Sequence, residues 1–212
     1  ALPICLVRIM PDGKLHVHSG CGNLGTYSYA ATARAAAEAL GGSWENMVIE
    51  RGDSRKGLPF VLGQFGSNST YTQTRTNWAA GMDAKAKLQE IAAKDLGGAP
   101  GDYDTTDGKV FNKANPSKSM SWAQAAKRAI ELGGKYSGKE MPKDINPITK
   151  WATASIAGTG LVGVTKDKRP KKGVTPGLVT AFVKIEVDTE TGKVEVLDHV
   201  EIADCGTAVH PA

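Results

Sequence analysis

Apolar and polar residues alternate through most of the first fifty positions, and one alanine-rich segment interrupts the alternation. The alternating stretches predict strands at 4–10, 14–19 and 47–50, with a turn at 11–13 between the first two. The alanine-rich segment 28–40 predicts a helix, and the two glycines that follow it are typical of a helix end. The chain therefore opens with the order strand, turn, strand, helix and strand.

A second and longer helix is predicted at 72–96, where apolar residues recur close to the 3.6-residue period. Oppositely charged residues four positions apart, Asp83 with Lys87 and Glu90 with Lys94, support this helix. The apolar period assigns one face of the helix to Trp78, Met82, Leu88, Ile91, Ala92 and Leu96.

A third helix is predicted to start at Ser121, because Gln124 three residues later completes a capping box, and to end at a glycine pair, 133–134. Its inward positions are Trp122, Ala125, Ala126, Ala129 and Ile130.

Two hairpins complete the pattern. The first spans 103–111 around an Asp-Gly turn, and the second joins 178–187 to 193–203.

These elements predict a mixed α+β fold in which antiparallel sheets have helices packed on one side. Residues 1–133 form the main α+β region. Residues 134–177 are rich in glycine and proline. We therefore expect them to form a segment without long helices or strands that wraps over the surface of the domain. Residues 178–212 are expected to complete the same domain with a β-hairpin. Both ends run directly into strand patterns, which indicates a piece of a longer polypeptide.

Composition narrows the class of protein. With 41% hydrophobic and 23% charged residues among 212, the chain has an ordinary globular balance. The net charge of +4 is concentrated in the run 166–172, which lacks the interleaved aromatic residues of nucleic-acid surfaces and is interpreted as a solvated loop. No apolar run has the length of a membrane span, and the first residues do not show the charged-then-apolar pattern of a signal peptide, although a segment ahead of Ala1 could carry an export signal. The compartment, cytoplasmic or periplasmic, stays open.

The residues that often bind metals are scattered. Cys5, Cys21 and Cys205 are far apart and form no metal-binding motif, so they are expected to be structural thiols. His16 and His18 lie on an alternating strand and are expected to face solvent. No metal-ligand set is predicted.

Two loops of small residues precede the first two helices. The segments 19–29 and 63–70 consist mostly of glycine, serine, threonine and asparagine. Free backbone N–H groups at a helix start bind phosphates and other anions, and small side chains let such a ligand approach. The two loops therefore predict an anion-binding site with one loop on each side, which we call the clamp.

Five landmarks in order give the sequence a resemblance to a known family. They are Gly20 and Gly25 before the alanine-rich helix, then Arg51-Gly52-Asp53-Ser54, then Gly66-Ser67-Asn68-Ser69-Thr70, then the helical stretch 88–93, and finally Asp204-Cys205-Gly206 with His210-Pro211 after the hairpin. This pattern resembles the xanthine dehydrogenase and aldehyde oxidase family. The resemblance covers nearly the whole chain and corresponds to the second molybdopterin-binding domain of the molybdenum-binding large subunit.

The resemblance implies that the chain is part of a molybdenum hydroxylase that oxidises an aldehyde or an N-heterocycle with water as the oxygen source. It implies a molybdopterin cofactor, with or without an appended cytosine nucleotide. Iron–sulfur clusters and FAD would lie on partner domains or subunits. The family's catalytic glutamate lies downstream of Ala212, so no catalytic residue is assigned and the segment alone is expected to be inactive.

The same resemblance implies cofactor contacts from Gly25 in the first loop and from Gln64, Phe65, Gly66, Ser67 and Asn68 in the second. The Gln-Gly that commonly follows the first-loop glycine is here Thr26-Tyr27. The side-chain amide contact to the molybdenum centre would therefore be either lost or replaced by the hydroxyl of Thr26.

Two alternatives remain open from the residues. The chain could be a non-catalytic scaffold or interaction domain of the same fold, whose cofactor site Tyr27 has closed by filling the gap between the loops. It could also be an unrelated phosphate-binding protein that uses one loop, although this leaves the C-terminal motif unexplained.

Overall fold

The chain divides into two units, one up to residue 168 and one from residue 169 onward. The structure is a computed structural model that describes residues 4–167, 177–204 and 206. Cys205, most of the basic run 166–172 and the C-terminal His210-Pro211 lie outside the described residues.

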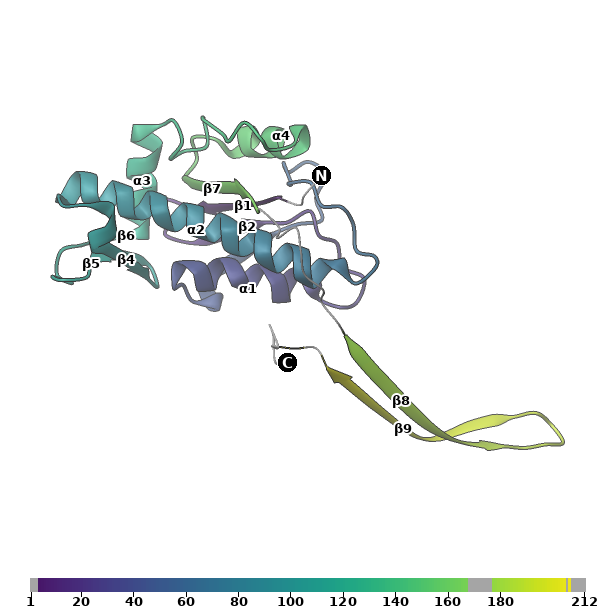
Figure 1. The fold of residues 1–212 in the computed structure, drawn as a ribbon. Coiled ribbons are helices and arrows are strands. Elements are labelled where there is room, and N and C mark those ends of the chain that lie inside the picture. Colours follow the sequence, from purple (N-terminus) through teal and green to yellow (C-terminus); the bar gives the residue numbers. More distant parts are fainter. Residues whose placement is uncertain (1–3, 168–176, 205, 207–212) are drawn as a thin grey trace. The chain divides into compact units, whose positions relative to one another are not determined.

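A four-stranded sheet forms the centre of the first unit (Figure 1). Its strand order is β3-β2-β1-β7, in which β1 is antiparallel to both β2 and β7, while β3 is parallel to β2. The predicted opening order of elements is confirmed. The strands are β1 (Ile4–Ile9), β2 (Leu15–His18), β3 (Met47–Glu50) and β7 (Leu161–Lys166).

Two helices cover one face of this sheet, α1 (Ser28–Leu40) and the 29-residue α2 (Asn68–Leu96). Their axes come close because α1 presents alanines and α2 presents Gly81. A Cβ added to Gly81 would lie 2.8 Å from the Ala36 carbonyl oxygen and 2.8 Å from the Ala39 methyl group. The alanine-rich face of α1 therefore serves close helix-on-helix packing.

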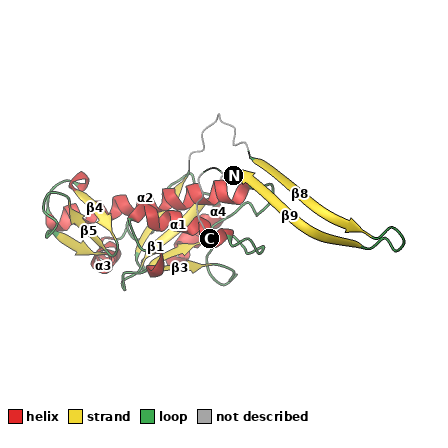
Figure 2. Ribbon diagram, turned by 90° about the horizontal axis from the view of Figure 1, so that it is seen from below, coloured by secondary structure: helices red, strands yellow, loops and turns green. Residues whose placement is uncertain are grey.

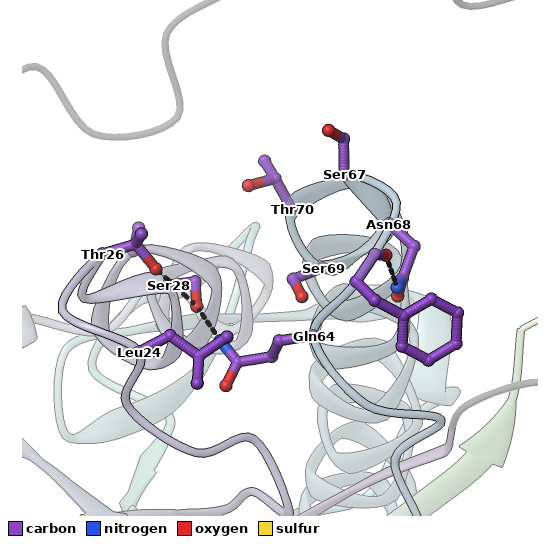
Figure 3. Close-up of a pocket in the computed structure, with 10 residues that line it drawn as sticks. Leu24, Thr26, Ser28, Gln64, Ser67, Asn68, Ser69 and Thr70 are labelled. Carbon is purple, nitrogen blue, oxygen red and sulfur yellow. Dashed lines mark hydrogen bonds between the residues drawn. The ribbon is translucent and has the colours of Figure 1, made fainter.

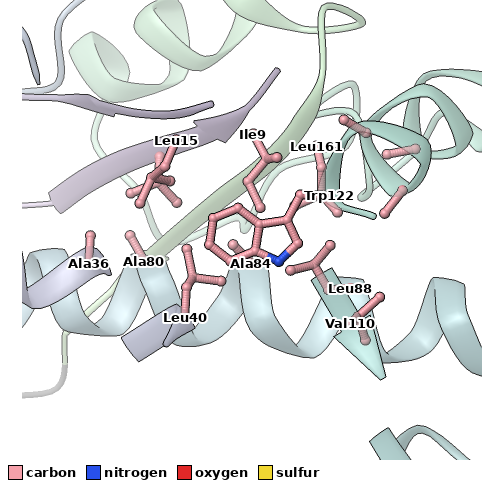
Figure 4. Close-up of a cluster of buried hydrophobic side chains, with 14 of the residues drawn as sticks. Ile9, Leu15, Ala36, Leu40, Ala80, Ala84, Leu88, Val110, Trp122 and Leu161 are labelled. Atoms are coloured by element: carbon pink, nitrogen blue, oxygen red, sulfur yellow. The ribbon is translucent and has the colours of Figure 1, made fainter. Parts of the chain in front are cut away.

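The core lies between the sheet and these helices (Figure 4). Strand side chains from β1, β2 and β7 meet Leu40 of α1 and Ala84 and Leu88 of α2, and the indole of Trp122 closes the cluster. All these side chains are at most 2% exposed. Their burial fixes α1 and α2 on the sheet and with them the two loops that begin these helices.

A small sheet lies beside the C-terminal half of α2 (Figure 2). The predicted 103–111 hairpin is confirmed as β4 (Tyr103–Thr106) and β5 (Lys109–Asn112), and β6 (Ser119–Ser121) adds a third strand. The capping box at Ser121 and Gln124 is confirmed at the start of α3 (Trp122–Leu132). Two short 3₁₀ turns, η1 (Trp44–Asn46) and η2 (Pro100–Asp102), complete this part.

The glycine- and proline-rich stretch 134–177 holds two regular elements, α4 (Pro147–Ile156) and β7. Asn146 caps α4 by accepting a hydrogen bond from the Thr149 N–H at 2.8 Å. Ala152 and Ile156 of α4 pack with Leu6 against the sheet face opposite α1 and α2. This stretch thus contributes a strand to the sheet and a covering helix. The proposed division of the chain at residues 133 and 177 stays a prediction.

The second unit is the predicted C-terminal hairpin, formed by β8 (Leu178–Val187) and β9 (Val194–Asp204). The strands pair antiparallel, with a register shift between Lys184 and Ile185. Its apolar side chains are exposed, among them Phe182 at 63% and Ile202 at 61%.

Three side chains correct the sequence-based expectations. His18 is 3% exposed, not solvent-facing, because the segment 57–61 and α4 cover its side of the sheet. Trp78 and Met82 share a period with the core residues of α2 but are 45% and 42% exposed. They lie outside the buried stripe of α2, which runs through Asn77, Ala80, Gly81 and Ala84. Among the charge pairs, Asp83 binds Lys87 as predicted, whereas Glu90 binds Lys135.

Candidate functional site

A pocket of about 380 Å³ lies where α1 and α2 begin (Figure 3). One wall comes from the loop 24–28 and the first turns of α1, and the other from the loop 64–67 and the first turn of α2. The two small-residue loops, 36 residues or more apart in sequence, thus converge in space as the clamp hypothesis requires. The lining residues are Leu24, Thr26, Ser28, Ala31, Gln64, Phe65, Ser67, Asn68, Ser69 and Thr70.

Both helices begin in the same unusual way. The N-cap residues Tyr27 and Ser67 have positive φ angles, 51° and 55°, and neither side chain caps its helix. Among the described residues they are the two non-glycine positions with positive φ. A left-handed conformation costs a residue with a Cβ roughly 1–2 kcal/mol, and such costs gather at functional sites. The first backbone N–H groups of both helices thus lack side-chain caps beside the pocket.

Gln64 joins the two walls of the pocket. Its amide Nε2 donates a hydrogen bond to the Ser28 hydroxyl at 2.5 Å (Figure 3). The Thr26 hydroxyl lies 3.5 Å from the same Ser28 oxygen, and the Cys21 sulfur lies 3.8 Å from it. Ser28 is therefore the centre of a small polar network that connects the start of α1 to the loop before α2.

Asn68 stabilises the second loop from within. Its Nδ2 donates to the Gly63 carbonyl at 3.3 Å and also to the Phe65 carbonyl, while its Oδ1 accepts from the Thr72 hydroxyl at 3.2 Å. These bonds close the loop against the first turn of α2. The Asn68 amide thus shapes the wall of the pocket.

The structure places the sequence-predicted site residues together. Thr26, Gln64, Phe65, Ser67 and Asn68 line the pocket. Gly25 and Gly66 flank it with φ angles of 87° and 57°, and a Cβ added to either would meet no atom within 4 Å. These glycines are required by backbone conformation, and space is open around them.

Sequence reasoning missed five lining residues, of which three are hydroxyl side chains in the first helical turns. A signal for these was present, because serine and threonine gather at both predicted helix starts. The missed residues are Leu24, Ser28, Ala31, Ser69 and Thr70.

Hydroxyl and amide side chains line the pocket together with the apolar Leu24, Ala31 and Phe65, and none of the lining side chains is ionised. Its donors are hydroxyls, amides and the positive ends of two helix dipoles, and such donors suit a phosphate or another polar anion. In the described part of the chain no three His, Cys, Asp or Glu side chains lie close enough together to hold a metal ion. The donors fit the phosphate and polar edges of an organic cofactor.

Comparison with known sequences identifies the family. Residues 3–212 match the family described as molybdopterin cofactor-binding domain. The chain belongs to this family. The match extends over both the clamp loops and the C-terminal hairpin, which agrees with the resemblance found in the sequence.

Known relatives are similar along almost the whole chain. The carbon monoxide dehydrogenase large chain of Afipia carboxidovorans is 26% identical over 97% of this chain and 22% of its own length. The aldehyde oxidoreductase molybdenum-binding subunit PaoC of Escherichia coli K12 is 25% identical over 97% of this chain and 23% of its own. The chain therefore spans about a quarter or less of the relatives that it matches.

Solved structures support the fold. The alignment with the Cu,Mo-CO dehydrogenase structure covers 99% of this chain and 24% of the matched chain, with a TM-score of 0.68 and 24% sequence identity. The alignment with quinoline 2-oxidoreductase from Pseudomonas putida 86 covers 98% of this chain and 24% of the matched chain, with a TM-score of 0.62 and 21% sequence identity. The predicted α+β class of the molybdopterin-binding type is confirmed, but the expectation that helices pack on one side is wrong, because α4 covers the face of the central sheet opposite α1 and α2.

No helix in the described residues is both long enough and apolar enough to cross a membrane.

Proposed function

We propose that this chain is the molybdopterin-binding part of a molybdenum hydroxylase, which oxidises an aldehyde or an N-heterocycle with oxygen from water. The observation that carries the proposal is the convergence of two small-residue loops at two helix N-termini around one pocket. The family match and the names of its relatives, an aldehyde oxidoreductase subunit among them, support this choice of chemistry.

The residues of the clamp bind and orient the cofactor. Backbone N–H groups at the starts of α1 and α2 donate to its phosphate, and the hydroxyls of Ser28, Ser67, Ser69 and Thr70 add donors that can rotate to suit the ligand. Gln64 holds the two walls at a fixed separation through Ser28. When bound, the cofactor supplies the molybdenum centre at which the substrate is oxidised.

The remaining steps belong to parts of the enzyme outside this chain. The catalytic base and the substrate pocket would come from the rest of the large subunit, and the two electrons would leave through iron–sulfur clusters and a flavin on partner domains or subunits. The clamp also allows for a nucleotide, such as cytidine, appended to the cofactor.

A non-catalytic scaffold with a closed site requires Tyr27 to fill the gap between the loops. Tyr27 is 63% exposed and is not among the residues that line the pocket. This geometry favours a site that is open to the cofactor.

The test places a negative charge in the clamp of the natural full-length protein with its partner subunits. Ser69→Asp sets a carboxylate in the first turn of α2, where aspartate stabilises a helix but repels a phosphate. Bound molybdenum and pterin should fall about tenfold or more, which corresponds to roughly 1.4 kcal/mol, while the unfolding temperature is maintained.

Ser121→Asp is the matched control, since Ser121 caps α3 by accepting from the Gln124 N–H at 3.1 Å and aspartate can do the same. This variant should keep its full cofactor content. A Ser69→Asp protein that binds as much cofactor as the control would refute the proposed clamp.

A further inference from the structure

A segment of five residues, 57–61, lies between the first loop of the clamp and α4. It follows β3, has no helical or strand structure and leads directly into the second loop of the clamp, which begins at residue 63. Gly57 and Pro59 are buried, so the segment is packed into the first unit. We call residues 57–61 the strap.

One side of the strap lies along α4. The Phe60 N–H donates to the hydroxyl of Thr149, which is 0% exposed, at 3.2 Å. Gly57 lies against the other end of the helix, because a Cβ added to it would overlap the Ser155 Oγ. The three residues from Gly57 to Phe60 span about 10 Å when extended, and the six from Thr149 to Ser155 rise about 9 Å along a helix. The strap therefore runs extended along α4, towards the N-terminus of the helix.

The other side of the strap holds the first loop of the clamp. A Cβ added to Gly20 would overlap the Pro59 carbonyl oxygen and lie 3.0 Å from the Val61 Cγ2 atom. The backbone of the first loop thus rests directly on the backbone of the strap, at a position where only glycine leaves enough room. The proline ring restricts the backbone of the strap at this contact.

The strap also determines where the second loop of the clamp begins. Gln64, which bonds Ser28 across the pocket, follows three residues after Val61. A Cβ added to Gly22 in the first loop would lie 3.3 Å from the Gln64 Oε1 atom. The position of Gln64 therefore depends on the strap and on the first loop together.

We propose that the strap transmits the position of α4 to both walls of the clamp, so that Thr149 and Gly57 are positioning residues of the cofactor site. Neither residue lines the pocket. The sheet in turn fixes α4 through the packing of Ala152 and Ile156 against Leu6. The effect of the strap on cofactor retention rests on the proposed function.

Thr149→Val tests the strap in the natural full-length protein with its partner subunits. It removes the hydroxyl that accepts from Phe60 and keeps the shape of the side chain. Bound molybdenum and pterin should fall about threefold or more, because a hydrogen bond that holds the strap is lost. Thr149→Ser keeps the hydroxyl and should keep the full cofactor content.

Thr153→Val is the matched control on the same helix. The Thr153 hydroxyl is also buried, but it donates within α4, to the Thr149 carbonyl at 2.8 Å. This variant should bind as much cofactor as the unchanged protein.

Hydrogen exchange separates a positioning role from a local structural one. In the full-length protein produced without cofactor, Thr149→Val should speed amide exchange several-fold in both clamp loops, 19–29 and 63–70, because both rest on the strap. A local role would speed exchange only in the strap and in α4. Exchange does not depend on what the clamp binds. It therefore tests the strap even if the unchanged holoprotein holds neither molybdenum nor pterin, the result that would overturn the proposed function.

Gly57→Ala displaces the strap more strongly. The added methyl group would overlap the Ser155 Oγ and lie 2.9 Å from the Ala152 Cα, so the strap must move away from α4. In Gly160→Ala, the matched control, the methyl group would overlap the Ile9 carbonyl oxygen, at the end of β1 away from the clamp loops. Both variants should lower the unfolding temperature, and only Gly57→Ala should also lower the cofactor content.

Two results would overturn the strap and leave the proposed function standing. One is a molybdenum and pterin content in Thr149→Val and Gly57→Ala equal to that of the unchanged holoprotein. The other is exchange in the clamp loops of Thr149→Val no faster than in those of Thr153→Val.

Discussion

The Gln64 amide donates to the Ser28 hydroxyl at 2.5 Å and thereby connects the loop before α2 to the first residue of α1. This bond joins the two walls of the pocket, which come from segments that are far apart in the sequence. If the two loops act as one site, the bond matters more for cofactor retention than for folding.

Gln64→Ala removes the connection across the pocket. We expect the content of molybdenum and pterin to fall several-fold, because the two walls are no longer held at one separation. The unfolding temperature should change little, since Gln64 is only half-buried. Gln89→Ala is the control, because Gln89 donates to the Tyr103 carbonyl at 2.7 Å far along α2. That variant should lose some stability and keep its cofactor, and the reverse pattern would contradict this role of Gln64.

Gly81→Ala tests the close contact of α1 and α2. The added methyl group would lie 2.8 Å from the Ala36 carbonyl oxygen. Overpacking of this kind costs about 1–3 kcal/mol, and the helix propensity of alanine offsets at most about 1 kcal/mol of it. The unfolding temperature should therefore fall. At Gly101 an added Cβ meets no atom within 4 Å, so Gly101→Ala should be close to neutral. Equal stability of the two variants would contradict the packing.

The buried side chain of His18 should make the stability of the fold depend on pH. Burial lowers its pKa from 6.5 to about 3, with a further lowering by the charge of Arg8 and an opposing effect of Glu50. Both ring nitrogens lack a hydrogen-bond partner among the described residues. Between pH 6.5 and 3 the unfolded state therefore binds more protons than the folded state, so the free energy of unfolding decreases as the pH falls, by up to about 1.4 kcal/mol per pH unit.

His18→Leu should remove this contribution, so that the free energy of unfolding varies less between pH 6.5 and 4. The control is His199→Leu on the exposed β9, which should keep the dependence of the unchanged protein. Denaturant titrations at several pH values measure both. Identical slopes for the two variants would show that His18 is not the group responsible.

Local signals allowed most of the elements to be predicted. Gly41 and Gly133 end their helices, and Ser121 with Gln124 begins one, as expected. Caps and turns depend on residues a few positions apart, which a single sequence displays directly. For the same reason the hydroxyl-rich loops could be assigned to helix starts and their convergence proposed.

Features that depend on distant segments could not be predicted. Burial of His18 follows from the segment 57–61 and α4, which cover the second face of the sheet. The exposure of Trp78 depends on which face of α2 packs against the sheet and α1. A local signal for α4 did exist, since Asn146-Pro147 combines an N-cap residue with a proline in the first turn. It was obscured by the many glycines and prolines around it.

The most direct test of the central claim is metal and pterin analysis of the complete natural polypeptide, purified together with its partners. Elemental mass spectrometry measures molybdenum, and fluorescence after oxidation measures pterin. The account predicts close to one molybdenum and one pterin per large subunit. A well-folded, fully expressed complex with neither would contradict it and would favour a scaffold that has lost the cofactor.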